Sequence, residues 1–100
     1  MEFQKYTGLG NDFIITNENI SSEKVSKLCD RRFGVGADGL IVAEKRNGKF
    51  FMKFFNSDGS RAKMCGNGIR CYTQYLVENG LVDDNGNIEI DTAGTAIYSN

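Results

Sequence analysis

The sequence contains no histidine, no tryptophan and only three cysteines. Without histidine, a tuned cysteine is the leading candidate for any acid–base chemistry near neutral pH. Without tryptophan, seven Phe and four Tyr must fill much of the core. Because three is an odd number, the cysteines are a poor basis for a set of disulfides and favour a reducing compartment.

Strong charge and long apolar runs are also missing. A formal net charge of −1 over 100 residues gives no reason to expect a nucleic-acid partner. No apolar run approaches the roughly 20 residues that span a bilayer, and the first residues lack a basic segment followed by an apolar one. With no histidine and no C-x-x-C pair, no metal site is expected. We therefore expect a cytoplasmic protein of one domain, or part of one, without a membrane partner.

The hydrophobic pattern predicts short strands, glycine-rich turns and two helices. Strands are expected over residues 3–7, 13–16, 40–46, 50–55 and 87–92. Turns are expected over residues 8–12, 34–39, 47–48 and 84–86, and a loop over 56–67. A further turn and the start of another strand occupy the last eight residues, and this pattern suggests that an element is cut there.

The two predicted helices have different apolar faces. The first is capped by Ser21 or Ser22 and is expected to run to about Arg32. Its inner face is Val25, Leu28 and Cys29. The second runs from about Gly66 to Asn79, where Gly80 supplies a stop. Its apolar face consists of Ile69, Tyr72, Tyr75, Leu76 and Val77.

Cys65 stands directly before the second helix, in the run Met64-Cys65-Gly66-Asn67-Gly68. A thiol there meets backbone N–H groups and the positive end of the helix dipole, and both favour the reactive thiolate. Gly66 and Gly68 leave the backbone open to an anion, and the Asn67 amide can donate or accept. This combination favours a site for a small zwitterion. The alternative is a buried structural cysteine, the common role in cytosolic proteins.

Two asparagines, Asn11 and Asn56, lie beside glycine-rich turns. Each alone is explained by local turn chemistry, since Asn caps turns and tolerates left-handed backbone. Together they could converge on one ligand.

Two other chemistries are disfavoured. The spacing Gly34-x-Gly36-x-x-Gly39 matches a dinucleotide fingerprint only superficially, because it follows a predicted helix and precedes a strand. Cys71 is six residues beyond Cys65, about 9 Å along the helix and on another face, so a redox pair is not expected. Cys71 and Cys29 are expected to pack in the core.

Four segments together resemble the N-terminal half of diaminopimelate epimerases. They occur in the family's order: Gly8-Leu9-Gly10-Asn11-Asp12-Phe13, Gly34-Val35-Gly36-Ala37-Asp38-Gly39-Leu40, Phe54-Phe55-Asn56-Ser57-Asp58-Gly59-Ser60 and Met64-Cys65-Gly66-Asn67-Gly68-Ile69-Arg70-Cys71. Proline racemases share the fold but typically carry His where this chain has Asn67, and the phenazine-biosynthesis relatives lack the catalytic cysteine.

The resemblance implies an α+β fold in which a curved, mixed, largely antiparallel sheet wraps around a central helix. It implies a cofactor-independent isomerase that interconverts LL- and meso-diaminopimelate for lysine and peptidoglycan synthesis. Cys65 matches one of two catalytic cysteines. The matching substrate-binding positions are Asn11, Asn56, Gly66 and Asn67.

The family's second cysteine belongs to a second half, which is absent from residues 1–100. Neither Cys29 nor Cys71 matches its motif. We therefore expect a single domain that is inactive by itself, exposes the surface that meets the missing half, and self-associates weakly. The whole enzyme could also form a homodimer, and the sequence does not decide this. The alternative function is a small-molecule binding module that holds an amino acid without catalysis.

Overall fold

The computed structural model describes residues 2–8, 10–46, 49–62, 66–82, 88–92 and 95–99. The elements within these ranges are β1 (Gln4–Gly8), β2 (Asn11–Thr16), α1 (Ser22–Cys29), β3 (Gly39–Arg46), β4 (Lys49–Asn56), α2 (Gly66–Glu78), β5 (Ile88–Thr92) and β6 (Thr95–Ser99). The expected α+β class is confirmed. No helix in the described part of the chain is long and apolar enough to cross a membrane.

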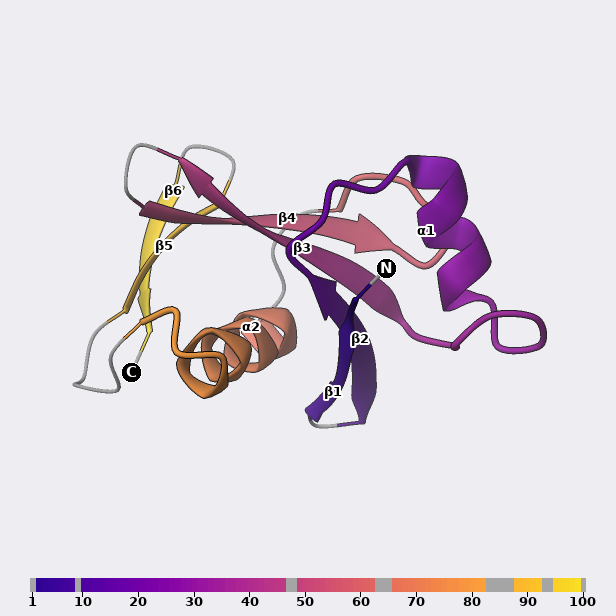
Figure 1. Ribbon diagram of the computed structural model, residues 1–100, viewed down its shortest axis with the longest axis horizontal. Coiled ribbons are helices and arrows are strands. Elements are labelled where there is room, and N and C mark those ends of the chain that lie inside the picture. Colours follow the sequence, from indigo (N-terminus) through magenta and orange to yellow (C-terminus); the bar gives the residue numbers. More distant parts are fainter. Residues whose placement is uncertain are drawn as a thin grey trace.

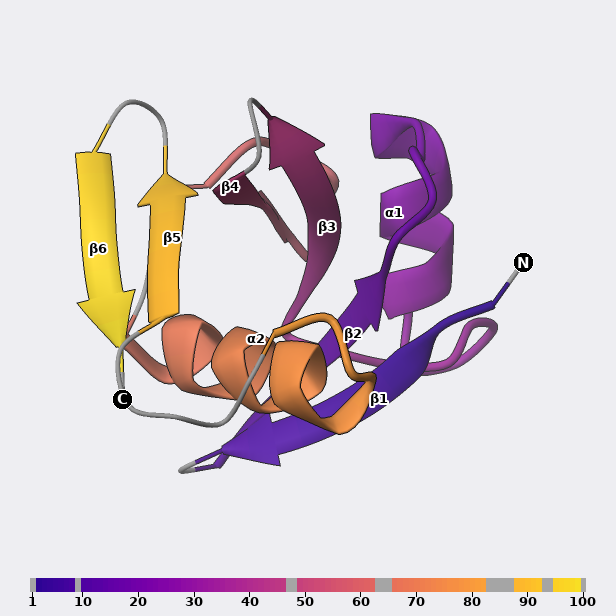
Figure 2. The same ribbon diagram turned by 60° about the vertical axis from the view of Figure 1, so that its left-hand side comes forward.

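The strands form one mixed sheet in sequence order, β1-β2-β3-β4-β5-β6. The pairs β1–β2, β3–β4 and β5–β6 are antiparallel, whereas β2–β3 and β4–β5 are parallel. The parallel pairs arise because α1 and α2 provide the crossovers that a parallel connection needs. Figure 2 shows the sheet curving around α2, with β1 on one side and β6 on the other. The expectation of a largely antiparallel sheet wrapped around a helix is confirmed.

The two faces of the sheet carry separate apolar clusters. On the inner face, α2 packs Tyr72 and Leu76 against Phe13, Ile41 and other strand residues. On the outer face, α1 packs Val25 and Cys29 against β2, β3 and β4. Alternation along β4 supplies both clusters, because Met52 and Phe54 point to one face and Phe55 points to the other. Figure 1 shows α1 and α2 well separated, as two helices on opposite faces must be.

Helix α1 is shorter than predicted. It begins after its N-cap Ser21, whose side chain accepts from the N–H of Lys24, and it ends at Cys29 rather than near Arg32. Asp30 has extended backbone angles, φ −64° and ψ 127°. Its Oδ1 accepts from the N–H groups of Arg32 and Phe33 at 2.7 and 3.0 Å. This local turn competes with the helix for the same backbone donors and stops it.

Helix α2 ends at Glu78, one residue before the predicted Asn79, and the predicted stop Gly80 follows with φ +69°. The N–H of Gly80 donates to the carbonyl of Val77, and the N–H of Leu81 donates to the carbonyl of Leu76. These two bonds form a Schellman motif, which needs a left-handed residue and therefore favours glycine.

Several predicted turns and side chains lie outside the described residues. They are the Asn47-Gly48 and Asp84-Asn85-Gly86 turns and the side chains of Ile88 and Ile90, which alternation along residues 87–92 predicts to point inward. The turn predicted over residues 8–12 is shorter than expected, because β1 extends to Gly8 and β2 starts at Asn11.

Candidate functional site

The sheet brings Asn11 and Asn56 to the same end. Strand β2 begins at Asn11, β3 begins at Gly39 and β4 ends at Asn56. The register places Phe13, Gly39 and Asn56 in one row across the three strands. We call this the site end of the sheet. Strands β2 and β3 are parallel and strands β3 and β4 are antiparallel, so the start of β2 and the end of β4 lie at the same end of the sheet. This topology explains the predicted convergence of Asn11 and Asn56.

The first turns of α2 lie at the same site end. A Cβ placed on Gly8, the strand partner of Asn11, would lie 3.1 Å from Cys71 Sγ. The N–H of Ala62, in the segment that leads into α2, donates to the carbonyl of Phe54 at 2.9 Å. Helix α2 runs antiparallel to β1, since Asn79 at its far end bonds to Gln4.

Gly66 and Asn67 form the first turn of α2, as predicted. Their backbone N–H groups have no carbonyl acceptor within the helix, because every α-helix leaves its first N–H groups without one. No acidic side chain stands in this first turn, so the dipole at the helix start is not offset there by a carboxylate of the turn. The catalytic candidate Cys65 and the side chain of Asn67 lie outside the described residues.

Asn11 is half-buried at the start of β2. Its neighbour Asp12 is held tightly. The N–H of Asp12 donates to Asp38 Oδ2 at 2.8 Å, and the N–H of Asp38 donates to the Asp12 carbonyl at 2.9 Å. The turn that ends at Asp38 is therefore fastened to the strand that carries Asn11.

A charged network surrounds the Asp12 carboxylate. Thr7 Oγ1 donates to Asp12 Oδ1 at 2.7 Å, Arg31 Nη1 donates to Oδ2 at 3.3 Å, and Lys5 Nζ lies 3.8 Å from Oδ2. The Thr7 hydrogen bond, followed by the Arg31 hydrogen bond, lowers the pKa of Asp12 below its ordinary value. The hydrogen bond from Arg31 to Asp12, followed by its hydrogen bond to Asp38, raises the pKa of Arg31 in turn. Asp12 is therefore ionised at neutral pH.

Asn56 is held by its own turn. Its Nδ2 donates to Ser60 Oγ at 2.9 Å, its backbone N–H donates to the Ser60 carbonyl, and its carbonyl accepts from the N–H of Gly59. Asp58 Oδ1 accepts from both the N–H and the hydroxyl of Ser60, which lowers the pKa of Asp58. The local turn chemistry predicted for Asn56 is thus present, and it fixes the side chain while leaving it exposed.

The other two cysteines are structural, as predicted. Cys29 is 3% exposed in the outer cluster, and Cys71 is 3% exposed in the inner cluster. Burial raises the pKa of Cys29, so its thiol stays protonated at neutral pH. Among the described residues, no group of three or more His, Cys, Asp or Glu side chains could hold a metal ion.

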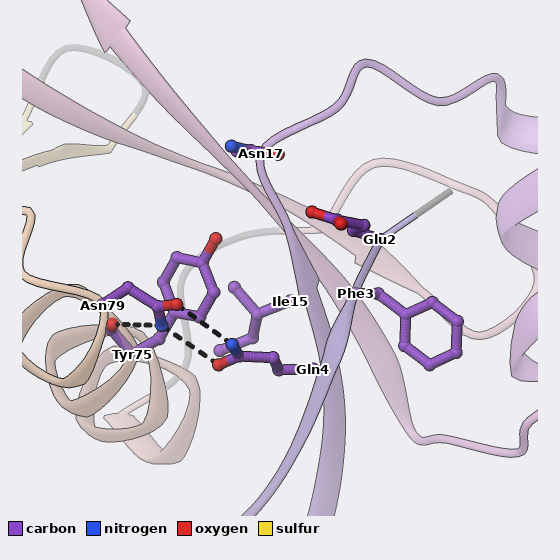
Figure 3. Close-up of a pocket in the computed structure, with 7 residues that line it drawn as sticks. All are labelled: Glu2, Phe3, Gln4, Ile15, Asn17, Tyr75 and Asn79. Atoms are coloured by element: carbon purple, nitrogen blue, oxygen red, sulfur yellow. Dashed lines mark hydrogen bonds between the residues drawn. The ribbon is translucent and has the colours of Figure 1, made fainter.

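A hollow of about 460 Å³ lies at the other end of the β1–β2 hairpin. Figure 3 shows Gln4 and Asn79, two of its lining residues, lying side by side with their amides in contact. The two amides exchange hydrogen bonds of 3.0 Å, and Asn79 Nδ2 also donates to the Tyr75 carbonyl at 2.8 Å. Of the predicted site residues that the structure describes, neither Asn11 nor Asn56 lines this hollow. We call this region the far end of the hairpin.

Comparison with known proteins decides the family. The family model described as diaminopimelate epimerase matches residues 3–99. The chain belongs to the diaminopimelate epimerase family. It is 46% identical over 100 residues to the diaminopimelate epimerase of Synechococcus sp. (strain JA-2-3B'a(2-13)), which covers 92% of this chain and 35% of that protein. It is 52% identical over 86 residues to that of Caldanaerobacter subterraneus subsp. tengcongensis, covering 82% of this chain and 31% of the relative.

A plant relative and a solved structure extend the comparison. The chloroplastic diaminopimelate epimerase of Oryza sativa subsp. japonica is 49% identical over 86 residues, covering 78% of this chain and 24% of that protein. The crystal structure of the Bacillus anthracis phenazine biosynthesis protein of the PhzF family superposes with a TM-score of 0.69 at 19% identity, covering 96% of this chain and 33% of that one. At that identity the likeness concerns the fold alone. The chain spans about a third of the length of the diaminopimelate epimerases that it matches.

Four residues that fix the backbone beside Asn11 and the turn of Asn56 were not predicted. Asp12 and Asp38 lie inside the glycine-rich segments that carry the family resemblance, and Asp58 and Ser60 lie inside the third. Their positions next to Asn11, Gly39 and Asn56 are the signal that could have identified them. Arg31 left no such signal, because it was assigned to the end of the first helix.

Proposed function

We propose that this chain is the N-terminal half of a cofactor-independent diaminopimelate epimerase, forming one domain over residues 1–100. The observation that carries the proposal is the match of the family over residues 3–99 together with the meeting of Asn11, Asn56 and the start of α2 at one end of the sheet. The activity would interconvert LL- and meso-diaminopimelate in the cytoplasm, for lysine and peptidoglycan synthesis.

The reaction needs two acid–base groups on opposite faces of the α-carbon. The Cys65 thiolate would take the α-proton and become a thiol, while a second thiol gives its proton to the other face and becomes a thiolate. The charge that develops on the substrate would be stabilised by N–H groups such as those of Gly66 and Asn67 at the start of α2. The amides of Asn11 and Asn56 would orient the substrate.

The second thiol must come from another part of the enzyme. Cys29 and Cys71 are both buried, in clusters on opposite faces of the sheet. Neither can approach a ligand at the site end without opening a core. We therefore propose that a second half supplies the other cysteine and the other wall of the cleft.

The test uses the complete product of the reading frame that encodes this chain. We expect it to exchange the α-proton of diaminopimelate in deuterated water and to epimerise it without pyridoxal phosphate. Cys65→Ala should abolish epimerisation but keep substrate binding in calorimetry. Cys29→Ala is the matched control and should keep turnover, since that thiol packs on the outer face.

Two results would contradict the proposal. Full epimerisation by residues 1–100 alone would exclude the requirement for two thiols. Unchanged function of Cys65→Ala would indicate instead a binding module that uses Asn11, Asn56 and the first amides of α2 without catalysis.

A further inference from the structure

We propose that Arg31 is a positioning residue that holds Asn11 in the geometry for substrate binding. The inference rests on the proposed function, because it takes Asn11 as a residue that contacts diaminopimelate. Arg31 itself lies outside the proposed contact set and acts through Asp12 and Asp38.

The guanidinium of Arg31 bridges two carboxylates. Its Nη1 donates to Asp12 Oδ2 at 3.3 Å and its Nη2 donates to Asp38 Oδ1 at 3.2 Å. The free oxygen of Asp38 is then directed at the N–H of Asp12, 2.8 Å away. Without the bridge, two like charges would face each other, which would weaken the bond that fixes the Asp12 backbone. Since Asn11 directly precedes Asp12, its side chain depends on that backbone.

The turn after α1 places Arg31 for this purpose. The N–H groups of Val35 and Gly36 both donate to the Leu28 carbonyl, and that of Ala37 donates to the Cys29 carbonyl. This folds the turn back over Arg31. Gly36 has φ +86°, and a Cβ there would lie 3.3 Å from Arg31 Cγ. The alkyl stem of Arg31 is therefore covered by Gly36, and its guanidinium reaches toward β2.

The ion pairs of Arg31 are expected to contribute little to the stability of the fold. Its side chain is 55% exposed, and exposed ion pairs contribute little to the free energy of unfolding. The fork of a guanidinium can satisfy two carboxylates at once, whereas an ammonium acts as a single point charge. Arginine is therefore suited to fixing geometry at this position, and lysine should replace it only in part.

The test is a double-mutant cycle between Arg31 and Asn11, measured as kcat/KM for epimerisation by the complete reading-frame product. We expect Arg31→Gln and Asn11→Ala each to lower kcat/KM by about tenfold, chiefly through KM, as for loss of a hydrogen bond to a charged group. The double variant should lose no more than about twofold beyond Asn11→Ala, because both changes remove one interaction. Arg31→Lys should restore part of the loss.

Arg32→Gln is the matched control. It removes the same charge one residue away, where Arg32 stacks on Phe33 at 5.3 Å. This variant should keep kcat/KM, and thermal unfolding of all variants should stay close to that of the parent protein.

The outcomes separate the two proposals. If the parent protein shows no epimerase activity, the proposed function fails. If it is active and the effects of Arg31→Gln and Asn11→Ala add, or Arg32→Gln costs as much as Arg31→Gln, the positioning role is overturned. If it is active and Asn11→Ala is silent, the role is equally overturned, since there is then no contact for Arg31 to position.

Discussion

The β1–β2 hairpin is fastened differently at its two ends. At the site end, charged groups hold it: Asp12 meets Lys5 and Arg31, and Arg31 continues to Asp38. At the far end, the side-chain amides of Gln4 and Asn79 exchange hydrogen bonds, and Tyr6 donates a hydrogen bond to Glu78 at 2.6 Å. Both ends are anchored to a helix or to the turn that follows one, α2 at the far end and α1 at the site end.

The difference follows from what each end must do. The far end closes the core, where Tyr75 packs edge-on against Tyr6 at 6.2 Å. The amide pair and the bond from Tyr6 to the Glu78 carboxylate hold it without an ion pair among the described residues. The site end carries Asn11 and lies beside the start of α2. Holding that end with ion pairs fixes its geometry while leaving the asparagine itself half-buried and accessible.

Breaking the turn behind Arg31 should have the largest effect. A Cβ on Gly34 would overlap the Lys27 carbonyl oxygen and lie 2.7 Å from that of Leu28. Because both neighbours are backbone, Gly34→Ala should lower the free energy of unfolding by about 3 kcal/mol, measured by urea denaturation.

Gly10→Ala is the control at the site end. Nothing lies within 4 Å of its added Cβ, so only the strain of φ +87° remains. Its cost should be about 1 kcal/mol. Equal losses in the two glycine variants would contradict the steric explanation.

Removing the amide pair should have a smaller effect at the far end. Asn79→Ala deletes the exchange with Gln4 and the bond to the Tyr75 carbonyl. We expect a loss of about 1 kcal/mol in the free energy of unfolding. Since amides do not titrate, the loss should be the same at pH 7 and pH 4. A strong dependence on pH would show that the far end is also held by charge through Asn79.

Acid should weaken the site end through Asp12. Its pKa is lowered from 3.8, first by Thr7 and then by Arg31, so the bound carboxylate stabilises the fold above pH 3.8. That contribution is lost as the pH falls from 3.8 through the lowered pKa. Asp12→Asn should therefore be less stable than the parent chain at pH 6 and should lose less on acidification, as followed by circular dichroism.

Glu78→Gln is the matched variant for the far end. The hydrogen bond from Tyr6, followed by that from Gln74, lowers the pKa of Glu78 as well. Glu78→Gln should therefore also reduce the stability that is lost on acidification. The reductions caused by Glu78→Gln and Asp12→Asn should be additive in a double variant. Strong coupling between them would contradict the separation of the two ends.

Salt should have the smallest effect and separate the ends most clearly. Raising ionic strength from 0.1 to 1 M shortens the Debye length from about 10 to about 3 Å. The Asp12 amide, bonded to Asp38, should then exchange its hydrogen faster, whereas the Asn79 amide, bonded to the Tyr75 carbonyl, should not. Arg31→Gln should remove this salt dependence, and nuclear magnetic resonance can follow both amides in one sample. An equal response at both positions would contradict the comparison.

The sequence anticipated the elements where periodicity was strong. The strand predicted over residues 50–55 is present within β4, and its alternation puts Phe54 and Phe55 in separate clusters. Spacing along the second helix identified Tyr72 and Leu76 as core, and both are fully buried. The prediction from hydrophobic spacing was wrong at the end of α1. There the Asp30 side chain accepts hydrogen bonds from the backbone and ends the helix, and hydrophobic spacing does not encode such bonds.

The candidate site was predicted only in part. Residue type and order indicated Asn11, Asn56, Gly66 and Asn67, and the strands and helix place their backbones at one end of the sheet. The roles of Cys65 and of these four residues toward a substrate stay predictions. Arg31 could not be found in advance, since its partners are 19 and 7 residues away in the chain.

Sequence by itself determined the family, the apolar faces and the stop at Gly80, because these depend on residue type and on spacing within a few turns. The tertiary structure decided which distant residues meet: Gly8 against Cys71, Tyr6 against Glu78, and Arg31 between two aspartates. Such contacts depend on strand order and on the direction of α2 across the sheet. Those are set by packing of the whole core, and no local pattern specifies them.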